Sequence, residues 1–317
     1  MDIQNFFRQR LNRLLALLVL PALLLLSLSG CAPRREETVD FRILTSFYPM
    51  YILTLNIAQG IEGVEVVNMA GQQTGCLHDY QLQNRDMKNL ETADAFIVNG
   101  AGMESFLDKV LQQLPDLPIV TASEGIELIA AGEEHGHQHG DEEHEHEEEA
   151  NPHVWVSITN CIQQVETVTE ALMELDPAHS SQYRENGTAY IAKLSSLRSE
   201  MHRELDELPN REIVTFHEAF PYFAEEFDLH IVEVVNREPD SQPSARELAD
   251  TIRLIRDTGV TAVFAEPQYS ESAARIISEE SGATLYFLDP VVTGEDDADS
   301  YLNAMKHNLE VLKTALA

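Results

Sequence analysis

The sequence predicts an α/β fold of two lobes, each a four-stranded parallel sheet flanked by helices, joined by one long interlobe helix. Short apolar runs alternate with helical patterns in both halves of the chain, which is typical of parallel sheets covered by helices. Between the halves, apolar residues recur at the spacing of one helical face over residues 176–208. A helix of that length spans a small domain, so we expect it to bridge the lobes.

In the first lobe, residues 41–178, strands and helices alternate. The expected strands are 41–47, 64–69, 95–99 and 118–122, and the expected helices are 48–58, 85–92, 103–114 and 158–175. Pro49 falls in the first turn of a helix and Pro115 follows the end of another. Both positions suit proline, which lacks an N–H and cannot continue a helix.

The linking helix is predicted over residues 179–208, and the second lobe over residues 209–317. Asp176-Pro177 favours a helix start, and Pro209 favours an end. The expected strands of the second lobe are 212–216, 230–235, 261–265 and 284–288, and its expected helices are 219–227, 244–258, 271–281 and 300–316. The two lobes share an architecture but show no residue-level repeat.

The charge of the chain is strongly negative. Its 317 residues contain 54 Asp and Glu against 21 Lys and Arg, which gives a formal net charge of -33. Nucleic-acid binding depends on Lys and Arg that neutralise phosphates, so we expect no nucleic-acid partner. A negative surface attracts cations.

The first 30 residues are predicted to be a lipoprotein signal peptide. Arg8, Arg10 and Arg13 precede an apolar run, 14–28, that is short for a membrane span. Leu28-Ser29-Gly30-Cys31 resembles the bacterial lipobox, after which Cys31 is lipidated and residues 31–40 form a tether. Acyl chains would hold the protein on the extracytoplasmic face of the cell membrane, periplasmic or cell-surface. A secreted protein with a thiol at Cys31 is the alternative.

A His- and Glu-rich loop, residues 133–149, interrupts the first lobe. It contains nine carboxylates and five histidines, which are His135, His137, His139, His144 and His146. Imidazole and carboxylate groups together suit zinc and neighbouring metals. The loop is therefore either an auxiliary site that holds metal weakly or a solvated spacer.

Four residues are candidate ligands of a metal between the lobes. His78 lies in the loop after the second strand and His153 follows the His/Glu loop, whereas His217 and Asp289 follow strands of the second lobe. Ligands in open α/β sheets bind at the carboxyl ends of strands. Two candidates from each lobe would tie the lobes together.

Several motifs spread over the mature chain resemble one known family. They are His78-Asp79-Tyr80, Asn151-Pro152-His153-Val154-Trp155, Phe216-His217-Glu218-Ala219-Phe220, Phe264-Ala265-Glu266-Pro267-Gln268 and Leu288-Asp289-Pro290. Together they resemble the zinc-binding lipoproteins of bacterial ABC-type metal uptake systems, in the metal-specific class of solute-binding proteins. The resemblance implies His78, His153, His217 and Asp289 as ligands.

The same resemblance bears on the choice of metal. Manganese-type relatives carry Glu where this chain has His217, and three imidazoles with one carboxylate suit tetrahedral Zn²⁺. Glu218 and Glu266 are candidates to accept the outer N–H of a ligating histidine. Many relatives have Pro where Leu77 stands, and Cys76, Asp289 or water is left open as the fourth ligand. A disulfide between Cys76 and Cys161 is also left open.

The expected function is capture of Zn²⁺ outside the cytoplasm and its delivery to an ABC permease driven by a cytoplasmic ATPase. Zn²⁺ would be the transported substrate, and the binding protein a monomer. The alternatives are a manganese- or iron-binding protein of the same class, or a surface adhesin or zinc store with a role in cell adhesion. We expect no enzyme, because four protein ligands close the position that catalytic zinc keeps for water and the sequence has no His-Glu-x-x-His motif.

Overall fold

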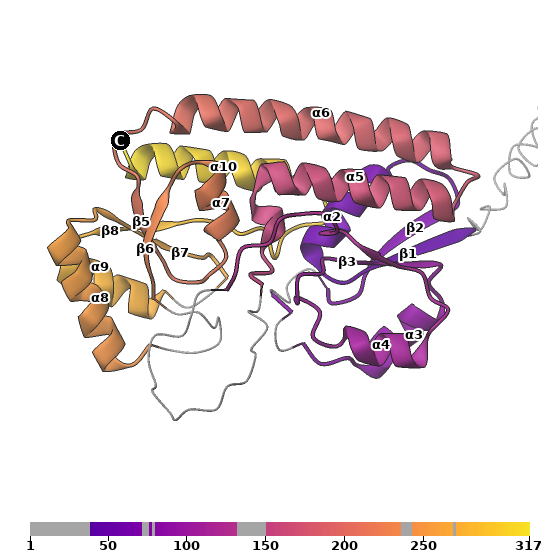
Figure 1. The fold of residues 1–317 in the computed structure, drawn as a ribbon, viewed down its shortest axis with the longest axis horizontal. Helices are drawn as coiled ribbons and strands as arrows, with labels where there is room; N and C mark the ends of the chain where they lie inside the picture. Colours follow the sequence, from indigo (N-terminus) through magenta and orange to yellow (C-terminus); the bar gives the residue numbers. More distant parts are fainter. Residues whose placement is uncertain (1–38, 72–75, 78–79, 132–149, 236–242, 269–270) are drawn as a thin grey trace, which may run out of the picture. The chain divides into compact units, whose positions relative to one another are not determined.

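Two parallel sheets form the framework of the computed structural model (Figure 1). The structure describes residues 39–71, 76–77, 80–131, 150–235, 243–268 and 271–317. The signal peptide, residue Cys31, most of the tether, residue His78 and the His/Glu loop lie outside these residues. Residues 39–317 make up one contact unit. In the described part of the chain, no helix has both the length and the apolar composition needed to cross a membrane.

The first sheet has four parallel strands in the order β2-β1-β3-β4. They are β1 (Phe41–Thr45), β2 (Val64–Asn68), β3 (Ala95–Val98) and β4 (Ile119–Thr121). The chain moves from β1 to one neighbour and then crosses to the other side for β3. The carboxyl ends of β1 and β3 therefore lie at a topological switch point, where open α/β sheets bind ligands.

The second sheet repeats this order with β6-β5-β7-β8, again all parallel. Its strands are β5 (Glu212–Thr215), β6 (His230–Val234), β7 (Ala262–Ala265) and β8 (Thr284–Phe287). The predicted fold class of two four-stranded parallel sheets is confirmed. His217 follows β5 and Glu266 follows β7, so both lie at the switch point of this sheet.

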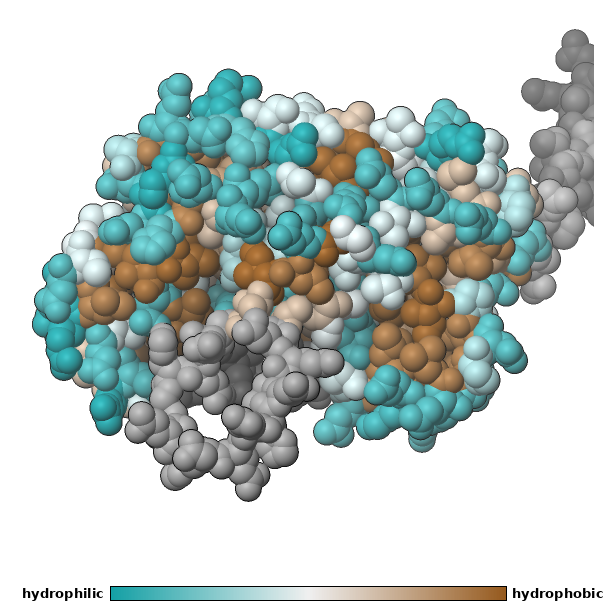
Figure 2. Space-filling view, in the orientation of Figure 1, coloured by the Kyte–Doolittle hydropathy of each residue, from teal (hydrophilic) through white to brown (hydrophobic). Residues whose placement is uncertain are grey.

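Helices cover the sheets and connect them. They are α2 (Tyr48–Ile57), α3 (Asn84–Glu91), α4 (Leu107–Gln113), α5 (Ile158–Leu175), α6 (Ser180–Leu205), α7 (Pro221–Glu226), α8 (Ala245–Thr258), α9 (Ser272–Ser281) and α10 (Ser300–Ala315). Helix α6, with 26 residues, extends over both sheets, with α5 beneath one part of it and α10 beneath the other (Figure 1). Along its outer side, Figure 2 shows hydrophilic residues interspersed with residues of intermediate hydropathy. The predicted long helix is thus present, and it begins and ends within a few residues of the expected bounds.

One expected helix is shorter than predicted. The pattern predicts a helix over 103–114, but α4 begins only at Leu107. The Glu104 side chain explains the difference, because it accepts hydrogen bonds from the backbone N–H groups of Asn99 and Gly100 at 2.8 and 3.0 Å. Residues 100–106 consequently form turns around this carboxylate and do not extend the helix.

The loop after β8 fastens the second sheet to the first lobe. The hydroxyl of Tyr48 donates to the carbonyl of Glu295 at 2.7 Å, and Asn56 Nδ2 donates to the carbonyl of Ala298 at 2.8 Å. A Cβ at Gly294 would collide with the Tyr48 hydroxyl, so this close approach requires glycine. One buried apolar cluster also contains residues of both sheets. The two lobes are therefore joined by direct contacts as well as by α6.

Candidate metal centre

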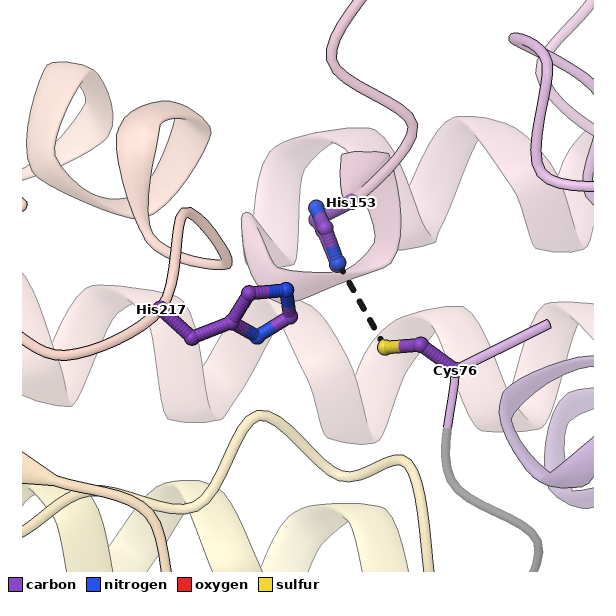
Figure 3. A group of neighbouring side chains, drawn as sticks. All are labelled: Cys76, His153 and His217. Carbon is purple, nitrogen blue, oxygen red and sulfur yellow. Dashed lines mark hydrogen bonds between the residues drawn. The ribbon is translucent and has the colours of Figure 1, made fainter. Parts of the chain in front are cut away.

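Three side chains from separate segments converge at one point. The rings of His153 and His217 and the thiol of Cys76 point toward one another (Figure 3). One potential ligand atom of each lies within 4.8 Å of the other two. The two imidazole rings are 4.7 Å apart between centroids and nearly perpendicular, at 88°. Such a group of nitrogen and sulfur donors can hold a transition-metal ion.

His153 is placed by the short sequence that surrounds it. It directly precedes a turn of 3₁₀ helix, Val154–Val156, and is only 2% exposed. Trp155, also buried, donates from its indole Nε1 to the carbonyl of Pro290 at 2.7 Å. Because that indole is anchored on the loop after β8, the backbone next to His153 is held against the second lobe.

Asn151 determines which nitrogen of His153 faces the cluster. Its Nδ2 donates to the carbonyl of Glu218 at 2.8 Å, so its Oδ1 is turned toward His153. This oxygen lies 3.1 Å from Nδ1 of His153 and also accepts the backbone N–H of His153. An amide oxygen can only accept, so Nδ1 carries the proton. In the neutral ring, Nε2 then presents its lone pair to the centre.

His217 is oriented in the same sense by a different group. Its Nδ1 lies 3.0 Å from Oε1 of Glu266, and both side chains are almost fully buried. The other carboxylate oxygen of Glu266 accepts from Gln268 Nε2 at 3.1 Å. A carboxylate accepts from the outer N–H of a histidine and increases the basicity of its other nitrogen. Nε2 of His217 is therefore the nitrogen available to a metal.

Cys76 completes the cluster from the loop that follows β2. Its Sγ lies 3.5 Å from Nε2 of His153. The next residue, Leu77, is fully buried, and its backbone N–H donates to Sδ of Met103 at 3.4 Å. Burial of Leu77 thus positions the half-buried Cys76 at the centre.

A second layer of buried polar groups supports the His153 segment. Asn99 donates from Nδ2 to the carbonyl of Pro152 at 2.9 Å and accepts from Gln164 Nε2 at 3.0 Å. The Glu104 carboxylate in turn accepts a hydrogen bond from the backbone N–H of Asn99 and so holds Asn99 in place. Burial raises the pKa of Glu104, although its hydrogen bonds oppose that shift. Asn99 lies 53 positions from Pro152 and 65 positions from Gln164, so no local sequence pattern predicted these two contacts.

Asp289 follows β8, and its side chain is engaged in a local hydrogen bond. Its Oδ1 accepts the backbone N–H of Val291 at 2.8 Å. Burial raises its pKa, and the nearby Glu266 carboxylate adds to the shift. Among the described residues, the group of mutually close ligand atoms contains Cys76, His153 and His217 and does not include Asp289. His78 lies outside the described residues.

Cys76 and Cys161 are not joined by a disulfide. Cys161 is 1% exposed in α5, and burial raises the pKa of its thiol to about 12. It is an inert core residue, whereas Cys76 lies among imidazoles.

A cavity of about 620 Å³ opens onto the histidine pair. Both histidines line it together with Glu218, whose backbone carbonyl is the one that accepts from Asn151. Ala131 and Ala150 also line the cavity. The His/Glu loop therefore leaves and rejoins the described chain at the mouth of the site.

Comparison with known proteins agrees with this arrangement. The family model described as the periplasmic component A of the zinc-uptake complex matches residues 43–315. The chain belongs to this family. Its members are solute-binding transport proteins and not enzymes, as the sequence led us to expect.

Individual relatives fall into the same class. The chain is 31% identical over 304 residues to the zinc-binding lipoprotein AdcA of Streptococcus pneumoniae, covering 93% of this chain and 60% of that protein. It thus spans less than two thirds of the length of that relative. It is 30% identical over 296 residues to the high-affinity zinc uptake system protein ZnuA of Bacillus subtilis, covering 92% and 91% of the two chains.

A solved structure shows that the metal can differ within this fold. The solute-binding protein FpvC of Pseudomonas aeruginosa, in complex with Mn²⁺, superposes with a TM-score of 0.76 at 28% identity. The match covers 87% of this chain and 98% of FpvC. Members of this fold are therefore not all described with zinc, and the metal of this chain has to be argued from the site itself.

Proposed function

We propose that this chain captures Zn²⁺ outside the cytoplasm and delivers it to a membrane permease driven by a cytoplasmic ATPase. The observation that carries the proposal is the buried pair of histidines, His153 and His217, each with its outer Nδ1 held by an acceptor. This arrangement presents two neutral imidazole nitrogens at one point. Zinc prefers such ligands, and outer hydrogen bonds of this kind support them in metal sites.

The proposed ligand set is His78, His153, His217 and Asp289, with Glu266 and Glu218 as supporting groups. Zinc is preferred over manganese because nitrogen ligands dominate this set, whereas manganese favours carboxylate and carbonyl oxygen. The zinc-binding names of the AdcA and ZnuA relatives support the same choice.

Attachment through Cys31 would keep the protein at the extracytoplasmic face of the membrane, beside the permease. We propose that it acts there as a monomer. The lobe boundaries at residues 178 and 209 stay a prediction of the sequence. Because contacts join both lobes directly, we propose that release involves the loop 71–80, which carries Cys76 and His78.

The His/Glu loop, residues 133–149, is proposed to hold additional zinc weakly near the entrance. The residues that flank it meet at the cavity, where Ala130 and Ala150 form an isolated antiparallel bridge. Zinc released from this acidic segment would already lie beside the histidine pair.

The deciding experiment measures zinc content and competitive zinc affinity of the chain from Ala32 onward, with and without residues 133–149. We expect one tightly bound zinc to remain after the deletion and additional weak zinc to be lost with the loop. If all zinc disappeared with the loop, the buried centre would not be the capture site.

Two alternative functions, transport of another metal and adhesion, predict different experimental results. Tighter binding of Mn²⁺ or Fe²⁺ than of Zn²⁺ in the same competition would identify a manganese or iron transport protein. Growth of a deletion strain in zinc-poor medium separates transport from adhesion, because only a transport component is needed there.

A further inference from the structure

We infer that Cys76 is a ligand of the transported ion, and that its thiolate restricts this site to thiophilic divalent metals such as zinc while rejecting manganese. The inference rests on the proposed function, since it concerns the ion held at the same centre. It adds a sulfur donor to the imidazole and carboxylate set that the sequence implies.

The separation of the donor atoms fits a shared metal ion. Tetrahedral zinc has Zn–S bonds of about 2.3 Å and Zn–N bonds of about 2.0–2.1 Å, which place the sulfur and a nitrogen about 3.5 Å apart. Sγ of Cys76 and Nε2 of His153 are 3.5 Å apart. The donor atoms of this group stay within 4.8 Å of one another, so small movements bring all three to one ion.

The direction of the donors also fits. Asn151 holds the proton of His153 on Nδ1, so the lone pair of Nε2 faces the sulfur. Without a metal, the thiol can donate to this nitrogen. A divalent ion replaces that proton between the same two atoms, because thiolates and neutral imidazoles are the metal-binding forms.

Cys76 is held in place by its neighbour. Leu77 is fully buried, and the backbone N–H of Tyr80 donates to the Leu77 carbonyl at 3.0 Å. The hydroxyl of Tyr80 is in turn bonded to Asp86 at 2.8 Å. Leu77 and Tyr80 are thereby tied to the first lobe, which places the sulfur of the adjacent Cys76 beside the histidines before a metal arrives.

The contrast with Cys161 argues against an ordinary packing role for Cys76. Cys161 is fully buried in the apolar face of α5, as is common for a cysteine that only packs. Cys76 is half-buried and its sulfur contacts an imidazole nitrogen. Its surroundings are those of a ligand.

The chemistry of sulfur then determines which ions are accepted. Thiolates favour zinc and other soft or borderline ions, whereas manganese favours oxygen donors. A centre with one sulfur and at least two imidazole nitrogens therefore discriminates by donor type. This discrimination acts on ions of equal charge, which the overall negative charge of the protein cannot distinguish.

The first test uses the unaltered protein with Co²⁺ as a spectroscopic substitute for zinc. We expect an intense near-ultraviolet thiolate-to-cobalt charge-transfer band that disappears when zinc displaces the cobalt. This measurement needs no substitution, so it does not depend on the folding of a variant. If the protein binds cobalt and zinc without such a band, the inference is wrong although the proposed function survives.

The second test compares zinc and manganese affinities in Cys76→Ser, Cys76→Asp and the matched control Cys161→Ala. We expect Cys76→Ser to lower zinc affinity roughly 100-fold, the loss expected for one zinc ligand, and to leave manganese affinity nearly unchanged. Cys76→Asp should raise manganese affinity above that of Cys76→Ser, because it supplies oxygen. Cys161→Ala should keep the wild-type zinc-to-manganese ratio.

An unchanged ratio in Cys76→Ser would overturn the inference. Failure of the wild-type protein to bind zinc at all would overturn the proposed function and the inference together. Thermal unfolding of each variant without metal establishes that the comparison is made between folded proteins.

Discussion

The two buried histidines of the metal centre are supported in chemically different ways. His153, on the side of the first lobe, donates to the neutral amide of Asn151, whereas His217, on the side of the second, donates to the carboxylate of Glu266. A carboxylate partner adds negative charge to the ring and strengthens its bond to a cation, while an amide mainly fixes direction. The first lobe therefore mainly orients its histidine toward the metal centre, whereas the second lobe also places a negative charge behind its histidine.

The amide also links the two sides. Asn151 reaches the backbone carbonyl of Glu218, the residue after His217, while the hydroxyl of Tyr222 donates to the carbonyl of Asn151. Each histidine is thus positioned partly by a group from the other lobe. The centre is a property of the interface and belongs to neither sheet alone.

The largest expected effect comes from removing either ring. Apparent binding free energies of about 10–16 kcal/mol for four-ligand zinc sites correspond to about 3 kcal/mol per ligand. We therefore expect His217→Ala and His153→Ala each to weaken zinc binding roughly 100-fold, measured by competition with a chromophoric chelator. His230→Ala, at the exposed start of β6, is the control and should bind zinc normally. Wild-type affinity in either ligand variant would remove that residue from the site.

Substitutions of the two hydrogen-bond acceptors, Glu266 and Asn151, should show how differently they support zinc binding by His217 and His153. Glu266→Gln keeps a hydrogen-bond acceptor but removes the charge, and we expect it to weaken zinc binding within the 10–100-fold range of outer partners. Asn151→Ala should cost about tenfold, near the lower end of that range. Equilibrium competition on both variants measures the difference. Equal losses of zinc affinity in the two variants would show that the negative charge of Glu266 does not contribute more than the amide of Asn151.

The smallest expected effect on the metal centre concerns Glu104, a buried carboxylate that reaches the His153 segment only through Asn99. Burial raises its pKa above the usual value for Glu, so in the interval between the two values the folded state binds more protons than the unfolded state. Its contribution to stability is therefore fully present below the usual Glu pKa and is lost as the pH rises through the raised value.

Glu104→Gln removes this titration and also leaves fewer acceptors for the N–H of Gly100, at a cost of about 1–3 kcal/mol. Urea unfolding of both proteins in mildly acidic and neutral buffer gives the comparison. The wild type should gain stability on acidification relative to the variant. Parallel pH profiles would contradict the assignment of the shift to Glu104.

Much of the fold followed from the sequence because its signals are local. The apolar period of α6 and the runs that became β1 to β8 depend on residues within a few positions of one another. The expected helix at 103–114 was wrong in its first turn, because the Glu104 carboxylate accepts hydrogen bonds from the Ser46 hydroxyl and from the backbone after β3. The hydrogen bond between Ser46 and Glu104 joins residues 58 positions apart, and helical periodicity cannot reveal such a contact.

The candidate site was predictable in outline only. His153 and His217 meet as the strand ends suggested, and Glu266 lies against His217. The part played by Asn151 depends on a carbonyl in the other lobe, and the approach of Cys76 depends on the burial of Leu77. Neither follows from spacing along the chain. Assignment of His78 and Asp289 as ligands stays a prediction.

The fastening of the loop after β8 onto α2 bears on how a transporter would recognise a loaded protein. With Tyr48 and Asn56 bonded to that loop, the sheets resist a hinge motion, and the radius of gyration in solution scattering should be the same with and without cargo. A permease could not then read occupancy from the angle between the lobes. Occupancy would then have to be recognised close to the metal centre itself, where a bound cation changes the charge beside Cys76, His153 and His217.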